Sequence, residues 1–284
     1  MPMSQINASI VLYHNNKEQL QKVIESFLNT DLHVKSPFGI KLYLIDNSAT
    51  DALKELALND ERIEYIFNNA NLGYGGGHNI AMRKSIENGV AYHVVLNPDI
   101  YFEKGVIEEL YAYMQAHRDV GQIMPKVLYP NGDLQKLCKL LPTPLDLFAR
   151  RFIPIKSFVN WINNRYELEF FSYDEIAEIP FLSGCFMFFR TDFLAQDCLF
   201  DEEFFMYLED ADLTRRIAKI SKTLYYPKVS IVHEYQRGAH KSRKLLYIFI
   251  ASVFTYFKKY GWFFDAERTR VNKKTLQNLG YYKR

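Results

Sequence analysis

The sequence predicts an α/β protein with a mixed, mostly parallel central sheet flanked by helices. Two observations predict this class. Short apolar runs alternate with helix-compatible stretches over the first hundred residues, as in successive strand–helix–strand units. The chain has 284 residues, of which 48% are hydrophobic and 15% aromatic, so it can bury a large core and is not a disordered protein.

The first elements form two strand–helix units and a third strand. Residues 8–13 alternate as a strand does, and residues 17–29 carry apolar side chains at helical spacing. The strand at 41–45 stops at Asp46-Asn47-Ser48, residue types that favour turns and helix caps. We expect a helix with Leu53, Leu56 and Ala57 on one side to follow, and then a short strand over 63–67.

A glycine-rich loop over 69–79 precedes a predicted helix over 80–88. Residues 91–96 then predict a buried strand that ends at Asn97-Pro98-Asp99. Ligands of open α/β sheets bind beyond the carboxyl ends of the strands. Because Tyr13, Asp46, the glycine loop and Asp99 all fall at such ends, we expect them to converge on one crevice.

The second half of the chain is less regular. A helix is expected near 103–117, and residues 138–179, which contain three prolines and many aromatics, are interpreted as a variable excursion. The remaining predicted elements are a strand over 181–190, a helix that begins within 204–217 and a final strand over 229–233.

Charge and cysteine content exclude several classes of protein. The formal net charge of +2 is too balanced for a dedicated nucleic-acid binder, so no nucleic-acid partner is expected. The three cysteines show no metal-type spacing and no disulfide framework, which favours a reducing compartment. No signal-peptide pattern precedes the first strand, so we expect a cytoplasmic protein.

Two acidic groups are candidates for chemistry. Asp99 comes just after a predicted buried strand, which cannot extend past Pro98. Its carboxylate, together with substrate phosphates, could hold Mg²⁺ or Mn²⁺. The alternative is that Asp99 caps the next turn. The segment Glu209-Asp210-Ala211-Asp212 brings three carboxylates into one helical turn. These require a cation, a substrate hydroxyl or a helix N-terminus as compensation. His233, at a strand end, is either structural or a ligand for a metal or a diphosphate.

The glycine-rich loop does not match the glycine pattern of dinucleotide-binding proteins. Backbone that approaches a diphosphate closely has a reason to be glycine-rich, but the third glycine of a dinucleotide fingerprint that begins at Gly73 would fall at His78. A flexible turn remains the alternative.

The carboxyl-terminal segment differs electrostatically from the rest. Residues 237–284 carry 12 Lys and Arg against two acidic residues, and a largely apolar run over 245–257 lies between basic clusters. This run is too short to span a bilayer, which takes about 20 residues. Packing on the main domain, membrane-surface contact through residues 241–260 and a homodimer contact are the alternatives.

Seven segments follow one another along the chain: Ser9-Ile10-Val11-Leu12-Tyr13, Ile45-Asp46-Asn47-Ser48, Asn71-Leu72-Gly73-Tyr74, Leu96-Asn97-Pro98-Asp99, Ser183-Gly184-Cys185, Glu209-Asp210-Ala211-Asp212-Leu213 and His233. In this order they resemble family 2 of the inverting glycosyltransferases, which have the Rossmann-like GT-A fold, and in particular its rhamnosyltransferase-like branch from bacterial surface-polysaccharide pathways. The resemblance covers about residues 6–240. It implies a catalytic domain over 1–240 and a helical, basic and aromatic extension over 241–284.

The resemblance also implies roles for individual residues. Asp210 matches the catalytic base and Glu209 its neighbour that helps to hold the acceptor. Asp99 matches the metal-binding member of an Asp-X-Asp element, whose first position is Asn97 here, and His233 would share the metal. Arg237 and Lys241 would cover the diphosphate. The nucleotide-sugar would contact Tyr13, Asp46, Asn71, Gly73, Gly76, Asn79 and Asn97.

The function implied is transfer of a sugar, with rhamnose as one option, from a dTDP- or UDP-sugar to a hydroxyl of a glycan or lipid-linked acceptor, assisted by Mn²⁺ or Mg²⁺. The enzyme would work in the cytoplasm, at the inner face of the cell membrane. Two other functions stay open. A sugar-phosphate nucleotidyltransferase would need a glycine-rich, basic loop after the first strand, where this chain has His14-Asn15-Asn16-Lys17. A non-catalytic membrane-surface protein would not need Asp99 and Asp210.

Overall fold

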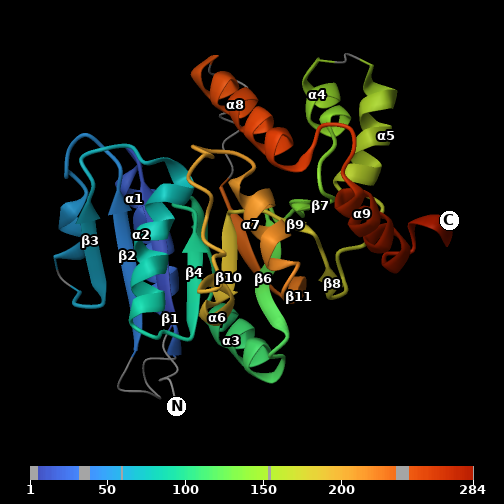
Figure 1. Ribbon diagram of the computed structural model, residues 1–284. Helices are drawn as coiled ribbons and strands as arrows, with labels where there is room; N and C mark the ends of the chain where they lie inside the picture. Colours follow the sequence, from blue (N-terminus) through green and yellow to red (C-terminus); the bar gives the residue numbers. More distant parts are fainter. Residues whose placement is uncertain (1–5, 32–38, 59, 153–154, 235–242, 284) are drawn as a thin grey trace.

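A nine-stranded sheet forms the centre of the protein in the computed structural model, which describes residues 6–31, 39–58, 60–152, 155–234 and 243–283 (Figure 1). The strand order is β3-β2-β1-β4-β10-β6-β11-β5, and β8 pairs with β11. The first four strands are parallel, β10 is antiparallel to both of its neighbours, and β6 and β11 are parallel. The strands are β1 Ile6–Leu12, β2 Ile40–Asp46, β3 Ile63–Phe67, β4 Tyr92–Leu96, β5 Ile100–Tyr101, β6 Val120–Leu128, β8 Ala177–Glu178, β10 Phe186–Arg190 and β11 Lys222–His233. The mostly parallel sheet predicted from the sequence is confirmed.

Alternating side chains make this sheet the middle of three layers. On β4, Val94 and Leu96 join the core under one face, whereas Val95 joins the core under the other face. Helices α1 and α3 contribute to the first core, and α2, α6 and α7 contribute to the cores on the opposite face. The helices are α1 Lys17–Leu28, α2 Gly73–Glu87, α3 Val106–Ala116, α4 Pro144–Phe152, α5 Lys156–Tyr166, α6 Thr191–Leu194, α7 Glu209–Ile217, α8 Arg243–Tyr260 and α9 Ala266–Asn278, with short 3-10 helices η2 Lys54–Ala57 and η4 Tyr281–Lys283.

Two local predictions were wrong in extent. The helix expected around Leu53 is only the 3-10 turn η2. The glycine-rich loop is the first part of helix α2, which begins at Gly73 and not at residue 80. Close packing explains this helix, because a Cβ at Gly77 would lie 2.7 Å from the side chain of Val11 on β1. The glycines therefore let α2 lie close to the sheet.

Strand β6 is missing from the predicted elements, although it lies between β10 and β11. Pro125 interrupts its sequence pattern, because proline cannot donate a ladder hydrogen bond. The structure accommodates Pro125 opposite Tyr226, where the register between β6 and β11 shifts before Ser230 pairs with Lys126.

The excursion at 138–179 has regular structure of its own. It contains α4, α5 and the short strand β7 Cys138–Lys139, which pairs with β9 Phe181–Leu182. Together with α8 and α9 it encloses a further hydrophobic core, to which Tyr166, Tyr225, Val253, Tyr256 and Leu276 contribute. In Figure 1, α4, α5 and α8 stand at one end of the molecule, beyond the sheet. No helix among the described residues has both the length and the hydropathy needed to cross a membrane.

Candidate active site

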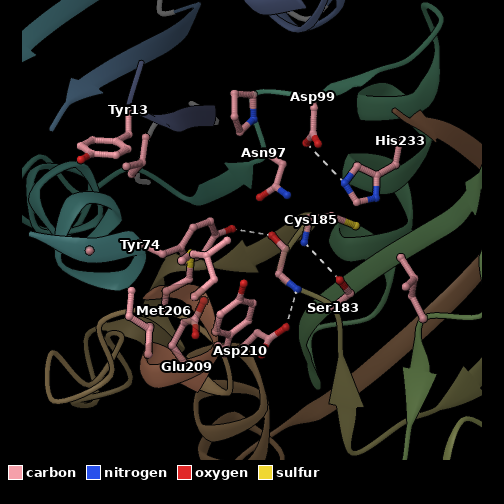
Figure 2. Close-up of a pocket in the computed structure, with 18 of the residues that line it drawn as sticks. Tyr13, Tyr74, Asn97, Asp99, Ser183, Cys185, Met206, Glu209, Asp210 and His233 are labelled. Carbon is pink, nitrogen blue, oxygen red and sulfur yellow. Dashed lines mark hydrogen bonds and ion pairs between the residues drawn. The ribbon is translucent and has the colours of Figure 1, made fainter. Parts of the chain in front are cut away.

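A cavity of about 1000 Å³ lies where the carboxyl ends of β1 and β4 meet the start of α7. Asp99 and Asp210 both line it, so the two acids that the sequence analysis paired share one cavity. Figure 2 shows Asp99 and His233 in the upper part of the view and Glu209 and Asp210 in the lower part, with Cys185 and Ser183 between them and Tyr74 to the left. Of the predicted site residues, those that line the cavity are Tyr13, Asn71, Gly73, Asn97, Asp99, Glu209, Asp210 and His233.

Strand pairing brings Asp99 to His233. His233 ends β11 and is in register with Ile100 on β5, which directly follows Asp99. The backbone N–H of Glu234 donates to the carbonyl of Asp99 at 2.8 Å. The side chains meet with His233 Nε2 3.3 Å from Asp99 Oδ1. This oxygen is buried and has no hydrogen bond in the structure, so a buried acceptor faces the imidazole.

These two side chains fit a divalent cation as part of its ligand set. An octahedral Mg²⁺ holds oxygen ligands at about 2.1 Å, so adjacent ligand atoms are about 3 Å apart, close to the separation seen here. The described residues contain no group of three or more His, Cys, Asp or Glu side chains that could hold a metal ion. A cation here would need substrate oxygens or water to complete its shell.

The acidic pair on the opposite side stands in the first turn of α7. Leu208 precedes it in the left-handed region, with φ 65°, and turns the chain into the helix. Asp210 Oδ2 accepts from the Gly184 backbone N–H at 2.9 Å, and Oδ1 accepts from Ala211 N–H at 2.9 Å. Glu209 is buried, and its Oε2 has no hydrogen-bond partner in the structure.

The surroundings of Glu209 and Asp210 shift their pKa values to different extents. It raises the pKa of Glu209 well above its ordinary value, and the neighbouring charge of Asp210 adds to this effect. Burial also raises the pKa of Asp210, but the N–H of Gly184 and the positive charge of Lys139 oppose the shift. Ionisation is thus disfavoured for Glu209, while the contacts of Asp210 with Gly184 and Lys139 favour its carboxylate form, which makes Asp210 the better proton acceptor of the two.

Tyr74 lines the cavity on the side of Asp210 and was not identified from the sequence as a site residue. Its hydroxyl donates to the Gly184 carbonyl at 2.6 Å, and the N–H of the same glycine holds Asp210. Burial and the negative charge of Glu209 raise the pKa of the Tyr74 phenol well above its ordinary value, so it remains a donor. The sequence signal that could have identified Tyr74 is its position directly after Gly73, which was itself predicted to contact the nucleotide-sugar.

Two further sets of cavity residues were also missed. Lys136, Lys139 and Lys244 bring basic side chains to the wall, and Gln135 lies beside His233. Helix α8 adds the apolar Leu245 and Ile248. The sequence around residues 134–139 shows no pattern that links this segment to the distant strand ends, so its place at the cavity is seen only in the tertiary structure.

Three predicted nucleotide-sugar residues do not line the cavity. Asp46 is fully buried and accepts hydrogen bonds from the Tyr65 hydroxyl at 2.6 Å and the Ser48 N–H at 2.8 Å. Gly76 lies within helix α2 and faces the side chain of Leu72. Asn79 is buried and bonds both backbone polar groups of Phe200, so its observed role is to fix a loop. Gly76 and Asn79 therefore make packing and backbone contacts beside the cavity, while Asn47 lines the cavity next to Asp46.

Arg237 and Lys241, the predicted diphosphate-binding residues, lie outside the described residues. Asp212, the third acid of the predicted cluster, does not line the cavity. It is fully buried and pairs with Arg216 at 2.8 Å and with Lys259 at 2.7 Å, so it joins α7 to α8.

Comparison with known proteins gives a consistent result. The sequence model for "Glycosyl transferase family 2" matches residues 9–196. An N-acetylglucosaminyl-diphospho-decaprenol L-rhamnosyltransferase from Mycobacterium tuberculosis is 25% identical over 247 residues, covering 80% of both chains. Rhamnosyltransferase WbbL from Escherichia coli K12 is 22% identical over 279 residues, covering 96% of this chain and 95% of that protein.

Among solved structures, GalNAc-T7 with UDP, GalNAc and Mn²⁺ superposes with a TM-score of 0.59 at 15% sequence identity. The match covers 82% of this chain but 44% of that one, so this chain spans less than half the length of GalNAc-T7. At this identity the likeness shows the fold, which agrees with the predicted GT-A architecture.

Proposed function

Since this chain belongs to family 2 of the glycosyltransferases, we propose that it transfers a sugar from a dTDP- or UDP-sugar to a hydroxyl group with inversion at the anomeric carbon. The observation that carries the proposal is the shared cavity of Asp99 and Asp210. Inverting transfer needs a base on one face of the sugar and charge compensation for the leaving diphosphate on the other.

In the proposed reaction Asp210 accepts the proton of the acceptor hydroxyl as its oxygen attacks the anomeric carbon. The new carbon–oxygen bond forms as the bond from that carbon to the diphosphate breaks, and the nucleoside diphosphate leaves with the electron pair. Mn²⁺ or Mg²⁺, held by Asp99, His233 and the diphosphate, would supply Lewis-acid stabilisation of that leaving group. Glu209, whose pKa is raised by burial, would hydrogen-bond the acceptor and help to hold it.

The donor is proposed to carry rhamnose, and the supporting observation is that both reported relatives are named as rhamnosyltransferases. Tyr13, Asn71, Gly73 and Asn97 are the cavity-lining candidates for contacts with the nucleotide-sugar. Asp46 is buried and bonded to Tyr65 and Ser48, so its proposed contact with the nucleobase would require these bonds to rearrange.

The acceptor is proposed to be a lipid-linked saccharide. The M. tuberculosis relative is named for an acceptor that joins a sugar through a diphosphate to a polyprenol. In this chain Lys136, Lys139 and Lys244 could compensate phosphate charge at the cavity, and Leu245 and Ile248 offer apolar contact at the same wall.

Membrane-surface contact through residues 241–260 is part of the proposal, at the inner face of the cell membrane. On α8, Arg243, Tyr247, Ala251, Phe254 and Lys258 are exposed at helical spacing, so basic ends flank an apolar centre. Tyr247 is 73% exposed and Phe254 55% exposed. Basic residues near anionic lipid contribute about 1 kcal/mol each, which favours this occupant for the exposed stripe.

Vesicle sedimentation tests the membrane contact. The double variant Tyr247→Glu and Phe254→Glu should lose binding to phosphatidylglycerol vesicles, whereas Gln277→Glu with Asn278→Glu on α9 should retain it. Equal binding by both double variants contradicts the membrane role. If instead the first double variant converts a wild-type dimer to a monomer, the stripe is a homodimer contact.

A donor screen and product analysis test the catalytic function. Wild-type protein with Mn²⁺, dTDP-rhamnose and a polyprenyl-diphosphate saccharide should release dTDP and form a product whose new linkage has inverted configuration by NMR. Release of pyrophosphate from a sugar phosphate and dTTP would support a nucleotidyltransferase. No transfer with any dTDP- or UDP-sugar would contradict the proposal.

A further inference from the structure

Gln135 makes three hydrogen bonds that together determine which of its side-chain atoms faces His233. Its amide nitrogen lies 2.7 Å from the carbonyl of His233 and 3.3 Å from the carbonyl of Leu128. Carbonyl oxygens only accept, so the atom facing them must be the NH₂ group. The amide oxygen of Gln135 is therefore directed to the imidazole, where it lies 3.0 Å from Nδ1 of His233.

This arrangement selects one form of the imidazole. An amide oxygen can only accept, so Nδ1 of His233 must carry the hydrogen, and in the neutral ring Nε2 then presents its lone pair. That lone pair faces Asp99 Oδ1 at 3.3 Å. Two acceptors so close repel each other unless a positive charge lies between them. A proton on Nε2 supplies that charge in the imidazolium form, and a divalent cation supplies it when the ring is neutral.

Backbone structure holds Gln135 in this place. Its N–H donates to the Val127 carbonyl at 2.9 Å, and the adjacent Leu134 forms an isolated bridge with Leu128 at the end of β6. Gln135 is 3% exposed, so little space is left for another rotamer. The segment that returns along β6 thus fixes the side chain against the end of β11.

We propose that Gln135 is a positioning residue that holds His233 in its Nδ1–H form, so that Nε2 and Asp99 present two acceptors to one divalent cation. The proposal rests on the metal-assisted function above and extends it to a residue that does not touch the cation. Outer-sphere partners of metal-binding histidines act in this way, and their loss typically costs 10- to 100-fold in metal affinity.

Wild-type protein without metal provides the first test. The ring nitrogens of His233, assigned by their loss in His233→Gln, are measured by long-range ¹H–¹⁵N NMR at a pH above which their signals no longer change. The Nδ1–H tautomer is expected. A predominant Nε2–H tautomer would overturn the proposal, whatever the outcome for metal or catalysis, and the test needs no variant of Gln135.

Metal affinity provides the second test. Mn²⁺ binding in the presence of UDP or dTDP is followed by the electron paramagnetic resonance signal of free Mn²⁺. Gln135→Met should weaken binding 10- to 100-fold. Gln135→Glu keeps an acceptor for Nδ1–H but loses both donations to the carbonyls of His233 and Leu128, so it should recover only part of the loss. The control is Gln122→Met, since Gln122 is a buried glutamine on β6 that bonds Thr214 outside the cavity.

The outcomes separate this inference from the proposed function. If wild-type and Gln135→Met bind Mn²⁺ equally while both remain folded, Gln135 has only a structural role and the inference fails alone. If wild-type protein transfers sugar at full rate with excess chelator, the metal-assisted function is wrong. The inference about Gln135 is then wrong as well, because it depends on that function. A tenfold or greater loss in Gln135→Met, with no loss in Gln122→Met, supports the inference.

Discussion

Replacing Asp210 by asparagine removes the proposed base while changing the shape of the side chain little. The amide oxygen can still accept from the Gly184 N–H, which lies 2.9 Å from Oδ2 in the wild type, but the NH₂ group cannot accept from the Ala211 N–H as Oδ1 does, so Tm is measured alongside to confirm that the fold around α7 persists. The amide cannot accept the acceptor's proton. General base catalysis typically contributes 10²- to 10⁴-fold, so we expect kcat to fall by that factor, or about 3 to 5 kcal/mol.

Donor binding should separate from turnover in this variant. Because Asp99 and His233 lie on the other side of the cavity, nucleoside diphosphate affinity measured by calorimetry should change less than threefold. Asp192→Asn is the matched control, since Asp192 also stands in the first turn of a helix but is exposed and does not line the cavity. A kcat for Asp210→Asn within a factor of ten of wild type would refute the base role. A loss confined to donor affinity would assign Asp210 to the nucleotide.

Further predictions concern charge and packing around the same cavity. Lys139→Met should move the acidic limb of the kcat–pH profile to higher pH, because the Lys139 charge lowers the pKa of Asp210; an unshifted limb would remove Lys139 from the site's electrostatics. Since burial raises the pKa of Glu209, its contribution to folding stability is present below about pH 4.5 and is lost as pH rises through the folded pKa. Glu209→Gln should therefore raise Tm relative to wild type increasingly above that pH, and a pH-independent difference in Tm would contradict this. Gly73→Ala should lower stability by at least about 1 kcal/mol in chemical denaturation, because Gly73 has φ +75° and a Cβ would lie 2.3 Å from the Phe205 carbonyl oxygen; unchanged stability would show that the Phe205 loop yields freely.

The sequence predicted the first half of the fold well because each element there has a local signal. The strand over 8–13 and the helix over 17–29 differ by only a residue or two from β1 and α1. Local sequence signals did not predict where helix α2 begins, because tertiary packing determines that position. Glycine has low helix propensity, yet Gly73 begins α2 because the helix must lie close to β1 and to the Phe205 loop.

The candidate site divides in the same way. Asp99 and Asp210 could be found because one follows the end of a strand and the other stands in the first turn of a helix, and resemblance to a family paired them. Gln135 and Lys139 could not be found, since they reach the cavity only through the return of the chain along β6 and through strand β7. The bonds of Asn79 to the backbone of Phe200 could not be predicted either, because an amide suits a ligand as well as it suits a backbone.

The division of labour between Asp99 and Asp210 is tested most directly by a crystal structure with Mn²⁺ and a nucleoside diphosphate. The account predicts Mn²⁺ in contact with Asp99, His233 Nε2 and the diphosphate oxygens, while the Asp210 carboxylate remains bonded to Gly184 and faces open space where the acceptor would bind. A diphosphate or a cation bound directly to Asp210, with Asp99 uninvolved, would contradict it.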